Sequence, residues 1–287
     1  MRAAHTVKEL RDSLESERMR GRVIGLVPTM GALHAGHAKL IETARRESDL
    51  VVVAIFVNPL QFGPNEDFAR YPRAFEEDLE LCRRIGADVV FAPSTEEMYP
   101  LPQLTFAEVI RLSEHLCGAS RPGHFRGVAT VVLKLFNIVQ PHRAYFGEKD
   151  AQQLAVLRRM TLDLNIPIRI VEVPTVREPD GLAVSSRNRY LDPEQRRIAP
   201  SLYGALQEAA SEVHSGEMDA SRVREAALRI LKENPAIRVD YVEVVDPDEI
   251  QPVTTITAPV RIAAAIWLGP TRLIDNILVQ PLPRKKR

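Results

Sequence analysis

Short apolar runs alternate with longer amphipathic stretches over residues 23–174 of the chain. Five of the runs have the composition and length of buried strands: residues 23–27, 50–57, 89–92, 144–146 and 166–173. Between them, apolar residues recur at helical spacing in residues 36–47, 75–85, 128–139 and 151–165. Strands that alternate with helices are typical of βαβ units around a parallel sheet. The pattern therefore predicts an α/β protein with a Rossmann-like, parallel-sheet nucleotide-binding domain.

The pattern changes after Pro174. A segment rich in Pro, Gly, Ser and Arg leads into helical spacing at residues 193–215 and 220–232. Three runs with β-branched residues follow, at residues 239–245, 260–268 and 272–279. We therefore expect a smaller α+β C-terminal domain at residues 176–287, acting as a lid on a domain at residues 1–175, with a hinge near the junction.

Composition and charge narrow the possible partners. The 287 residues carry 38 basic and 38 acidic side chains, so no global field attracts nucleic acid or an anionic membrane. The basic run at residues 284–287 is expected to be a solvated tail. Cys82 and Cys117 are interpreted as buried thiols in a reducing compartment. The N-terminus lacks the apolar region of a signal peptide, so we expect a cytoplasmic protein.

The first candidate site follows the first predicted strand, where the sequence reads PTMGALHAGH at residues 28–37. Ligands of parallel sheets bind at the carboxyl ends of strands, and a helix N-terminus attracts anions. His34 and His37 are three residues apart and would share one face of the first helical turn. One of them could simply cap the helix, and zinc is a second alternative. Phosphate binding is favoured because zinc usually takes three or four protein ligands.

A second candidate block, FGEKDAQQ at residues 146–153, again joins a strand end to a helix. Lys149 supplies a compact positive charge for a phosphate, and Asp150 can accept a hydrogen bond from a hydroxyl group. Gln153 lies on the same helical face as Asp150. Asp150 as an ordinary helix cap is the alternative, and both roles can coexist.

A third block is Ser185, Ser186, Arg187 and Asn188, in the segment between the two predicted domains. Two hydroxyl groups beside a guanidinium offer neutral and charge-assisted donors to phosphate oxygens. Such a loop can order itself when a ligand binds. Taken as an isolated string it is weak, because Ser/Arg loops are common on surfaces.

The three blocks, in this order and spacing, resemble the pantoate:beta-alanine ligase family. The third block extends to PTVREPDGLAVSSRNRYL at residues 174–191. Further similar segments are FVNPLQF at residues 56–62, YPR at 71–73 and RPGHFRG at 121–127, so the resemblance covers nearly the whole chain. The HxGH and SSR elements correspond in role to the HIGH and KMSKS signatures of class I aminoacyl-tRNA synthetases. Val184 is a departure, since the family often has methionine there.

The resemblance implies an AMP-forming carbon–nitrogen ligase of pantothenate biosynthesis, which supplies a coenzyme A precursor. Such an enzyme would condense pantoate with beta-alanine through a pantoyl-adenylate intermediate and release AMP and pyrophosphate. It also implies Mg²⁺ held mainly by ATP, and a homodimer formed through the nucleotide-binding domain. Glu77 and Asp78 are candidate helpers for the metal, but surface solvation is the favoured interpretation of this acidic pair. The sequence does not assign any protein ligand of Mg²⁺.

Site residues carry over from the family onto matching positions only. Six residues would bind the ATP phosphates and carry catalysis: His34, His37, Lys149, Ser185, Ser186 and Arg187. Gly147 and Asp150 would meet the ribose of ATP, the Val176 backbone would meet the adenine, and Met30 would also belong to the ATP site. The pantoate site would comprise Gln61, Gln153, Met30, Asn58 and Tyr71.

Two other functions remain possible at this point. A nucleotidyltransferase could use the same HxGH element to move AMP onto another small acceptor. A non-catalytic nucleotide sensor or an RNA-binding module could share the fold, but the zero net charge and the lack of a basic stripe with interleaved aromatic residues oppose RNA binding. The single Trp267 lies in a predicted strand and is expected to belong to the core.

Overall fold

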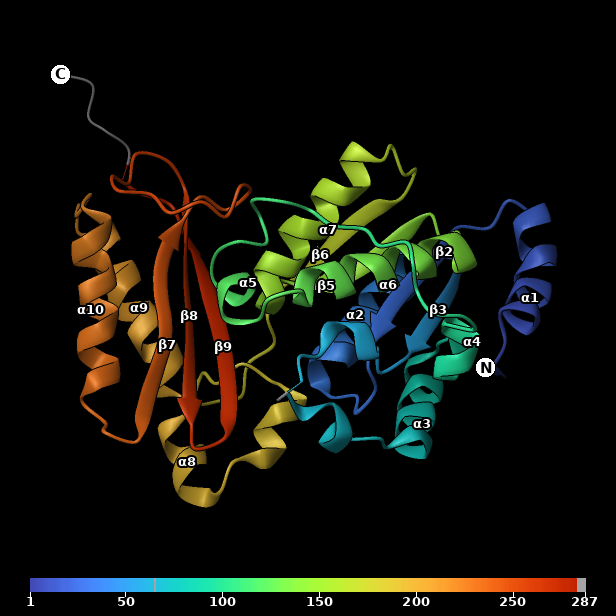
Figure 1. The fold of residues 1–287 in the computed structure, drawn as a ribbon, viewed down its shortest axis with the longest axis horizontal. Helices are drawn as coiled ribbons and strands as arrows, with labels where there is room; N and C mark the ends of the chain where they lie inside the picture. The colour runs from blue at the N-terminus through green and yellow to red at the C-terminus, as the bar shows by residue number, and fades with distance from the viewer. Residues whose placement is uncertain (65, 283–287) are drawn as a thin grey trace. The chain divides into compact units, whose positions relative to one another are not determined.

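Six parallel strands form the larger sheet of the computed structural model (Figure 1). They are β1 (Arg2–Ala4), β2 (Ile24–Thr29), β3 (Leu50–Ile55), β4 (Val89–Phe91), β5 (Arg143–Gly147) and β6 (Arg169–Val173). Their order across the sheet is β1-β4-β3-β2-β5-β6, and each neighbouring pair runs parallel. The chain leaves β2 toward β3 on one side and returns to β5 on the other. The order of strands therefore reverses beside β2, which is where open parallel sheets bind ligands.

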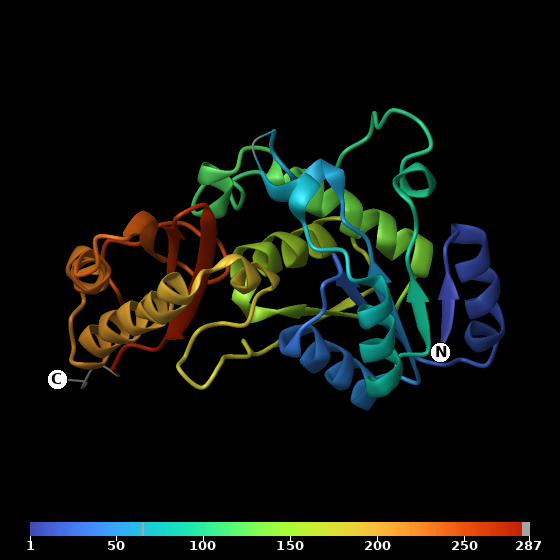
Figure 2. The same ribbon diagram turned by 90° about the horizontal axis from the view of Figure 1, so that it is seen from below.

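Five longer helices accompany this sheet: α1 (Val7–Met19), α2 (Ala35–Glu47), α3 (Phe75–Ile85), α6 (His124–Val139) and α7 (Ala151–Asp163). Shorter elements are the helices α4 (Thr95–Met98) and α5 (Cys117–Ser120), and the 3-10 turns η1 (Pro59–Gln61), η2 (Asp67–Arg70), η3 (Glu148–Asp150) and η4 (Ser186–Tyr190). Figure 2 shows α2 and α3 on one side of the strands and α6 on the other. This layering gives β3 two covered faces, which explains its uninterrupted apolar sequence.

The core under α2 shows how the apolar pattern produces the layer. Leu40, Ile41 and Ala44 lie on one face of the helix and are buried against strand residues that include Val27 and Val53. Each such side chain, once fully buried, contributes roughly 1.5–3 kcal/mol of transfer free energy. The predicted α/β fold class is confirmed, and the predicted strands and helices of this region overlap the observed ones.

The N-terminal strand and helix were not predicted. Helix α1 begins at a capping box in which the Thr6 side chain accepts from the backbone of Glu9 and the Glu9 side chain accepts from the backbone of Thr6. Leu10 and Leu14, four residues apart, are fully buried. The capping box and the leucine spacing can both be seen in the sequence, but the surrounding charged residues give this stretch a weak apolar pattern.

The smaller sheet is antiparallel, in the order β7-β8-β9, with strands β7 (Ile237–Val245), β8 (Val260–Leu268) and β9 (Thr271–Val279). The helices of this region are α8 (Pro193–Ile198), α9 (Ser201–His214) and α10 (Ala220–Lys232), and α9 and α10 share an apolar core with the sheet. The prediction of one helix over residues 193–215 was wrong. Pro200 lacks a backbone N–H, so the helix breaks there into α8 and α9.

The structure describes residues 1–64 and 66–282, so the basic run at 284–287 lies outside the described residues. The chain divides into two compact units. The first contains Met1–Val109, Arg121–Glu148 and Val156–Val176, and the second contains Ile110–Ser120, Lys149–Ala155 and the chain from Arg177 onward. Among the described helices, none is long and apolar enough to cross a membrane.

Gly127 in α6 generates a prediction about stability. A Cβ atom at this position would lie 2.2 Å from the carbonyl oxygen of Leu60 and 2.7 Å from Cα of Gln61. Gly127→Ala should therefore push α6 and η1 apart and lower the free energy of unfolding by about 1–3 kcal/mol. The matched control is Gly204→Ala in α9, where a Cβ would meet nothing within 4 Å. That variant should gain about 0.4–1 kcal/mol, and denaturant unfolding of both proteins would reveal equal shifts if this packing argument is wrong.

Candidate active site

Four adjacent strands of the parallel sheet deliver predicted site residues to one edge. The loop with His34 and His37 follows β2, and Asn58 and Gln61 follow β3. Gly147 ends β5 and Val176 follows β6. Since β3, β2, β5 and β6 are neighbours and parallel, their carboxyl ends lie at the same edge. The first unit thus gathers these residues at the position where a parallel sheet binds its ligand.

His34 and His37 form the N-terminus of α2. The Nδ1 atom of His34 accepts a hydrogen bond from the amide of Gly36 at 3.1 Å, and Nδ1 of His37 accepts from the amide of His34 at 3.3 Å. Their rings lie side by side, with centroids 4.0 Å apart. Gly36 is required because a Cβ there would come within 2.9 Å of the His34 ring. The capping role considered from the sequence is confirmed, and it orients both rings at a helix end that attracts anions.

Asp78 fixes the loop that leads to these histidines. One carboxylate oxygen accepts from the amide of Ala32 at 2.9 Å and the other from the amide of Leu33 at 2.7 Å. The interpretation of Asp78 as a surface residue was wrong, because only 2% of it is exposed, whereas its neighbour Glu77 is exposed. Two amides beside a buried carboxylate compensate for its lost hydration. Asp78 therefore holds the loop in place and is not part of the solvent-exposed surface of α3.

Gln61 belongs to a buried group of polar side chains. Its amide nitrogen lies 3.1 Å from the sulfur of Met30, and its amide oxygen accepts from Asn58 at 3.1 Å. The Asn58 side chain also donates to the carbonyl of Gly127 and accepts from the hydroxyl of Tyr99 at 2.8 Å. The structure thus brings together Met30, Asn58 and Gln61 as a group, and it adds Tyr99, which no sequence motif indicated.

Tyr71 lies near this group through an aromatic contact. It is buried, and its ring meets the ring of Phe62 edge-on with centroids 6.0 Å apart. Phe62 directly follows Gln61 in the chain. Burial also raises the pKa of the Tyr99 hydroxyl, which therefore remains a hydrogen-bond donor to Asn58 at neutral pH.

In the second unit, Lys149 is anchored through its main chain. The side-chain amide of Asn276 in β9 donates to the carbonyl of Lys149 at 2.9 Å. Asn276 is itself held by Arg261, and the adjacent Asp275 forms a bidentate ion pair with Arg177 at 2.5 and 3.0 Å. Most of this network is buried, so each group needs its partners. The network fixes the main chain of Lys149 without using its side chain.

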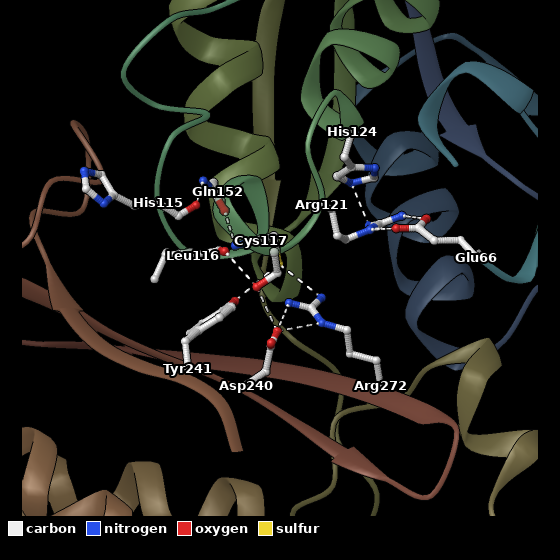
Figure 3. A network of polar contacts seen from close by, with 11 residues as sticks. Glu66, His115, Leu116, Cys117, Arg121, His124, Gln152, Asp240, Tyr241 and Arg272 are labelled. Atoms are coloured by element: carbon white, nitrogen blue, oxygen red, sulfur yellow. Dashed lines mark hydrogen bonds and ion pairs between the residues drawn. The ribbon is translucent and has the colours of Figure 1, made fainter. Parts of the chain in front are cut away.

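Gln152 anchors the start of α7, which directly follows Asp150 and carries Gln153. It accepts from the amide of Cys117 at 3.0 Å and donates to the carbonyls of Leu112 and His115. Figure 3 shows Gln152 next to Cys117, with His115 nearby. The next residue, Gln153, is only partly buried, which leaves surface for a ligand.

Cys117 continues the same polar network toward the antiparallel sheet. Its sulfur lies 3.3 Å from the hydroxyl of Tyr241, and Asp240 accepts from Arg272 at 2.7 Å and from Ser120 at 2.9 Å (Figure 3). Burial, reinforced by Cys117, raises the pKa of Tyr241. These contacts fix α5 and through it the Gln152 anchor.

The Ser185–Arg187 segment begins the turn η4. The Ser185 hydroxyl accepts from the amide of Arg187 at 3.3 Å, and Ser186 is buried. Asn188 donates to the carbonyl of Ala183 at 3.1 Å, while its own side-chain oxygen is buried and has no hydrogen-bond partner within the described chain. An acceptor of this kind can take a donor from a ligand.

Neither cysteine forms a disulfide, and both are buried as predicted. Burial, with the nearby charge of Asp78, raises the pKa of Cys82 to about 12, so this thiol is not a nucleophile. Within residues 1–64 and 66–282, no group of three or more His, Cys, Asp or Glu side chains could hold a metal ion. The zinc alternative for His34 and His37 therefore lacks the further ligands it would need.

A helix N-terminus built at the carboxyl edge of a Rossmann-like sheet, with two histidines, is the arrangement of a nucleotide-binding α/β enzyme. The family model of pantoate-beta-alanine ligase matches residues 2–278. The chain belongs to this family, and it is a ligase.

Relatives and solved structures agree with the family match. The chain is 55% identical over 280 residues to a protein from Moorella thermoacetica named pantothenate synthetase, covering 98% of this chain and 99% of the relative. A crystal structure of pantothenate synthetase from Thermus thermophilus superposes with a TM-score of 0.93 at 50% identity, covering 98% and 100% of the two chains. A pantoate-beta-alanine ligase from Francisella tularensis, described as complexed with beta-gamma ATP and beta-alanine, has a TM-score of 0.80 at 35% identity, with 97% of each chain covered.

The position of Asp78 generates a second prediction. In Asp78→Asn, one acceptor oxygen becomes an NH₂ group that faces a backbone N–H, so one amide of Ala32 or Leu33 loses its partner. This should lower the free energy of unfolding by about 1–3 kcal/mol and speed hydrogen exchange at these two amides. The control Glu77→Gln, at the exposed neighbouring position, should change neither. Unchanged exchange at Ala32 and Leu33 in Asp78→Asn would show that another group holds the loop.

Proposed function

We propose that this enzyme condenses pantoate with beta-alanine to pantothenate by way of a pantoyl adenylate, using ATP and releasing AMP and pyrophosphate. The main support is the family match along residues 2–278, which is stronger than a shared fold. It favours this ligase over the nucleotidyltransferase, which rested on the HxGH element alone, and over a non-catalytic sensor, which rested on the fold alone. The Francisella relative, described with ATP and beta-alanine, supports the same substrates.

The reaction needs two displacements. In the first, a carboxylate oxygen of pantoate attacks the α-phosphorus of ATP, and the bond to the bridging oxygen breaks as pyrophosphate leaves. In the second, the amine nitrogen of beta-alanine attacks the acyl carbon, a C–N bond forms, and AMP leaves as the nitrogen loses a proton. The first step brings two anions together, so positive charge and hydrogen-bond donors around the phosphates are its main requirement.

The phosphate-binding groups of the proposal are His34 and His37 in the first unit and Lys149, Ser185, Ser186 and Arg187 in the second. Support for the histidines comes from their position at the N-terminus of α2 and from the Asp78 contacts behind them. Support for Lys149 comes from its anchored main chain. Gly147 and Asp150 would contact the ribose, and the backbones of Met30 and Val176 would lie beside the nucleotide.

Pantoate would be bound by Gln61 and Gln153. Gln61 has a fixed side chain because Asn58 and Met30 contact its two ends. This supports orientation of a small hydroxy acid, and well-oriented reactants can gain effective molarities on the order of 10⁵ M or more. Asn58 would act mainly by holding Gln61, since its own side-chain oxygen already accepts from Tyr99. Tyr71 would line the same region.

Magnesium enters the proposal as part of the ATP substrate. The described residues offer no cluster of three acidic or histidine side chains, and both oxygens of Asp78 already accept from backbone amides. These residues fit a protein cage for Mg²⁺ poorly. ATP phosphate oxygens would therefore hold the ion, as Mg²⁺ commonly prefers.

A homodimer and a cytoplasmic location complete the proposal. Leu101 and Leu104 of the first unit are 76% and 90% exposed, and such apolar side chains gathered in one segment are typical of an interaction surface. This supports a second copy of the chain as partner. Two reduced, buried cysteines fit a reducing compartment.

The decisive experiment is exchange of labelled pyrophosphate into ATP without beta-alanine. The wild-type enzyme with pantoate and Mg–ATP should catalyse this exchange, because the first displacement is complete and reversible alone. Lys149→Ala should slow it by about 10²–10³, the usual loss for one transition-state donor. The exposed Lys232→Ala variant serves as control and should exchange normally. A wild-type protein that exchanges nothing, or that releases ADP, would rule out the adenylate route.

Replacing either glutamine with alanine should weaken the binding of pantoate and leave the affinity for ATP unchanged. Gln61→Ala and Gln153→Ala each leave polar groups of the hydroxy acid without partners, so KM for pantoate should rise by about tenfold or more. ATP affinity, measured by calorimetry, should stay near that of the exposed control Gln207→Ala. Loss of ATP binding with normal use of pantoate would mean that the two pockets are assigned in the wrong order.

A further inference from the structure

Glu66, Arg121 and His124 form a cluster beside Gln61 that the proposed function does not use (Figure 3). Arg121 binds the Glu66 carboxylate with two parallel hydrogen bonds, from Nε at 2.7 Å and from Nη2 at 2.6 Å. Its Nη1 atom lies 2.9 Å from Nε2 of His124. This is the fork geometry with which arginine recognises a carboxylate.

The cluster is joined directly to the turn that carries Gln61. The carbonyl oxygen of Gln61 accepts from Nη2 of Arg121 at 3.3 Å and lies 2.8 Å from Nδ1 of His124. Because Nδ1 faces a carbonyl oxygen, it must carry the proton, and Nε2 then accepts from Arg121. His124 in this form is neutral, so the guanidinium supplies the positive side-chain charge of the cluster.

Burial strengthens the pair. The side chains of Arg121 and Glu66 are only 14% and 24% exposed. Burial raises the pKa of Glu66, but the hydrogen bonds and charge of Arg121 outweigh it and lower the pKa below its usual value. Glu66 is therefore a carboxylate at neutral pH. His124 also begins α6, whose first amides add partial positive charge near the same place.

We propose that the Arg121 fork is the binding site for the carboxylate of beta-alanine and that Glu66 occupies this fork until the substrate displaces it. The inference rests on the proposed function. Of the two substrate carboxylates, that of pantoate must reach the phosphorus of ATP and become part of the mixed anhydride with AMP. The carboxylate of beta-alanine never reacts, so it can keep one ion pair through the whole second displacement. A fork on the Gln61 turn would hold that end while the amine, two methylene groups away, faces pantoate.

Glu66 then acts as a selectivity device. Replacing one carboxylate by another on the same fork leaves the guanidinium paired throughout, so no buried charge is exposed alone. An amine without a carboxylate cannot displace Glu66 in this way. The ion pair would thus favour amino acids over simple amines of the same length.

The test compares Arg121→Met with Glu66→Gln in the full chain, at saturating ATP and pantoate, with beta-alanine and n-propylamine as acceptors. Arg121→Met should raise KM for beta-alanine by about tenfold to a hundredfold, the usual loss for a hydrogen bond to a charged group, and leave KM for propylamine nearly unchanged. Glu66→Gln should lower KM for beta-alanine, because the internal competitor is gone. Arg126→Met, which removes an exposed guanidinium from the same helix, is the matched control.

Opposite signs in the two variants are the distinguishing result. A purely structural ion pair predicts that both variants raise KM for beta-alanine, and that outcome would overturn the proposal. Pyrophosphate exchange separates the steps, since Arg121→Met should keep a larger share of exchange than of overall turnover. If Arg121→Met does not fold, Arg121→Lys takes its place and should give a smaller rise in the same direction; unchanged KM there also refutes the site. Absence of exchange in the wild type would instead refute the proposed function, and this inference with it.

Discussion

The contact between the Asp78 carboxylate and the amides of Ala32 and Leu33 is the constraint on which the candidate site depends. The loop from Gly31 to His34 must turn sharply, with positive φ at Gly31 and Ala32, to start α2 at the right place. Alanine adopts such a backbone only at a cost, which the surroundings must offset. A buried carboxylate that accepts from both following amides supplies this compensation. Because this loop leads directly into His34, the Asp78 contacts also determine where the two histidine rings lie.

The parallel sheet then brings the separate motifs to one edge. Each motif lies in the turn that follows a single strand, so it contributes only part of the candidate site. The strand order beside β2 places the turns after β3, β2, β5 and β6 in one row. The second unit uses another principle: Asn276 of β9 holds Lys149 through its main-chain carbonyl, and the side chain of Gln152 binds the carbonyls of Leu112 and His115. Because the contact to Lys149 is made through its main chain, it does not use the Lys149 side chain.

Much of this fold could be read from the sequence because its periodicities are clean. The strand 260–268 was predicted with the observed limits, and the helix 75–85 also matched. Failures have local causes. Helix α1 buries only Leu10 and Leu14 in a charged stretch, and Pro200 interrupts a continuous apolar pattern.

Among the site residues, motifs could identify side chains that face a ligand but not those that stand behind them. Asp78 looked like part of an exposed acidic pair, and Asn276 lies 127 positions from Lys149, whose carbonyl it binds. Spacing within a motif carries no information about partners so distant in sequence. Trp267 illustrates a milder error, because it is only partly buried and lies under the guanidinium of Arg238, 4.9 Å from the ring centroid.

The close approach of Gly127 to Leu60 has a consequence for engineering. At this point α6 approaches η1 backbone to backbone, and the side chains of Arg121 and His124 add contacts to the carbonyl of Gln61. A library meant to widen the range of accepted hydroxy acids should therefore leave α6 alone. Such a library should instead vary Phe62 and the rings that contact it, Phe68 and Tyr71. A change of ring size there alters the shape of the space next to Gln61 without changing α6.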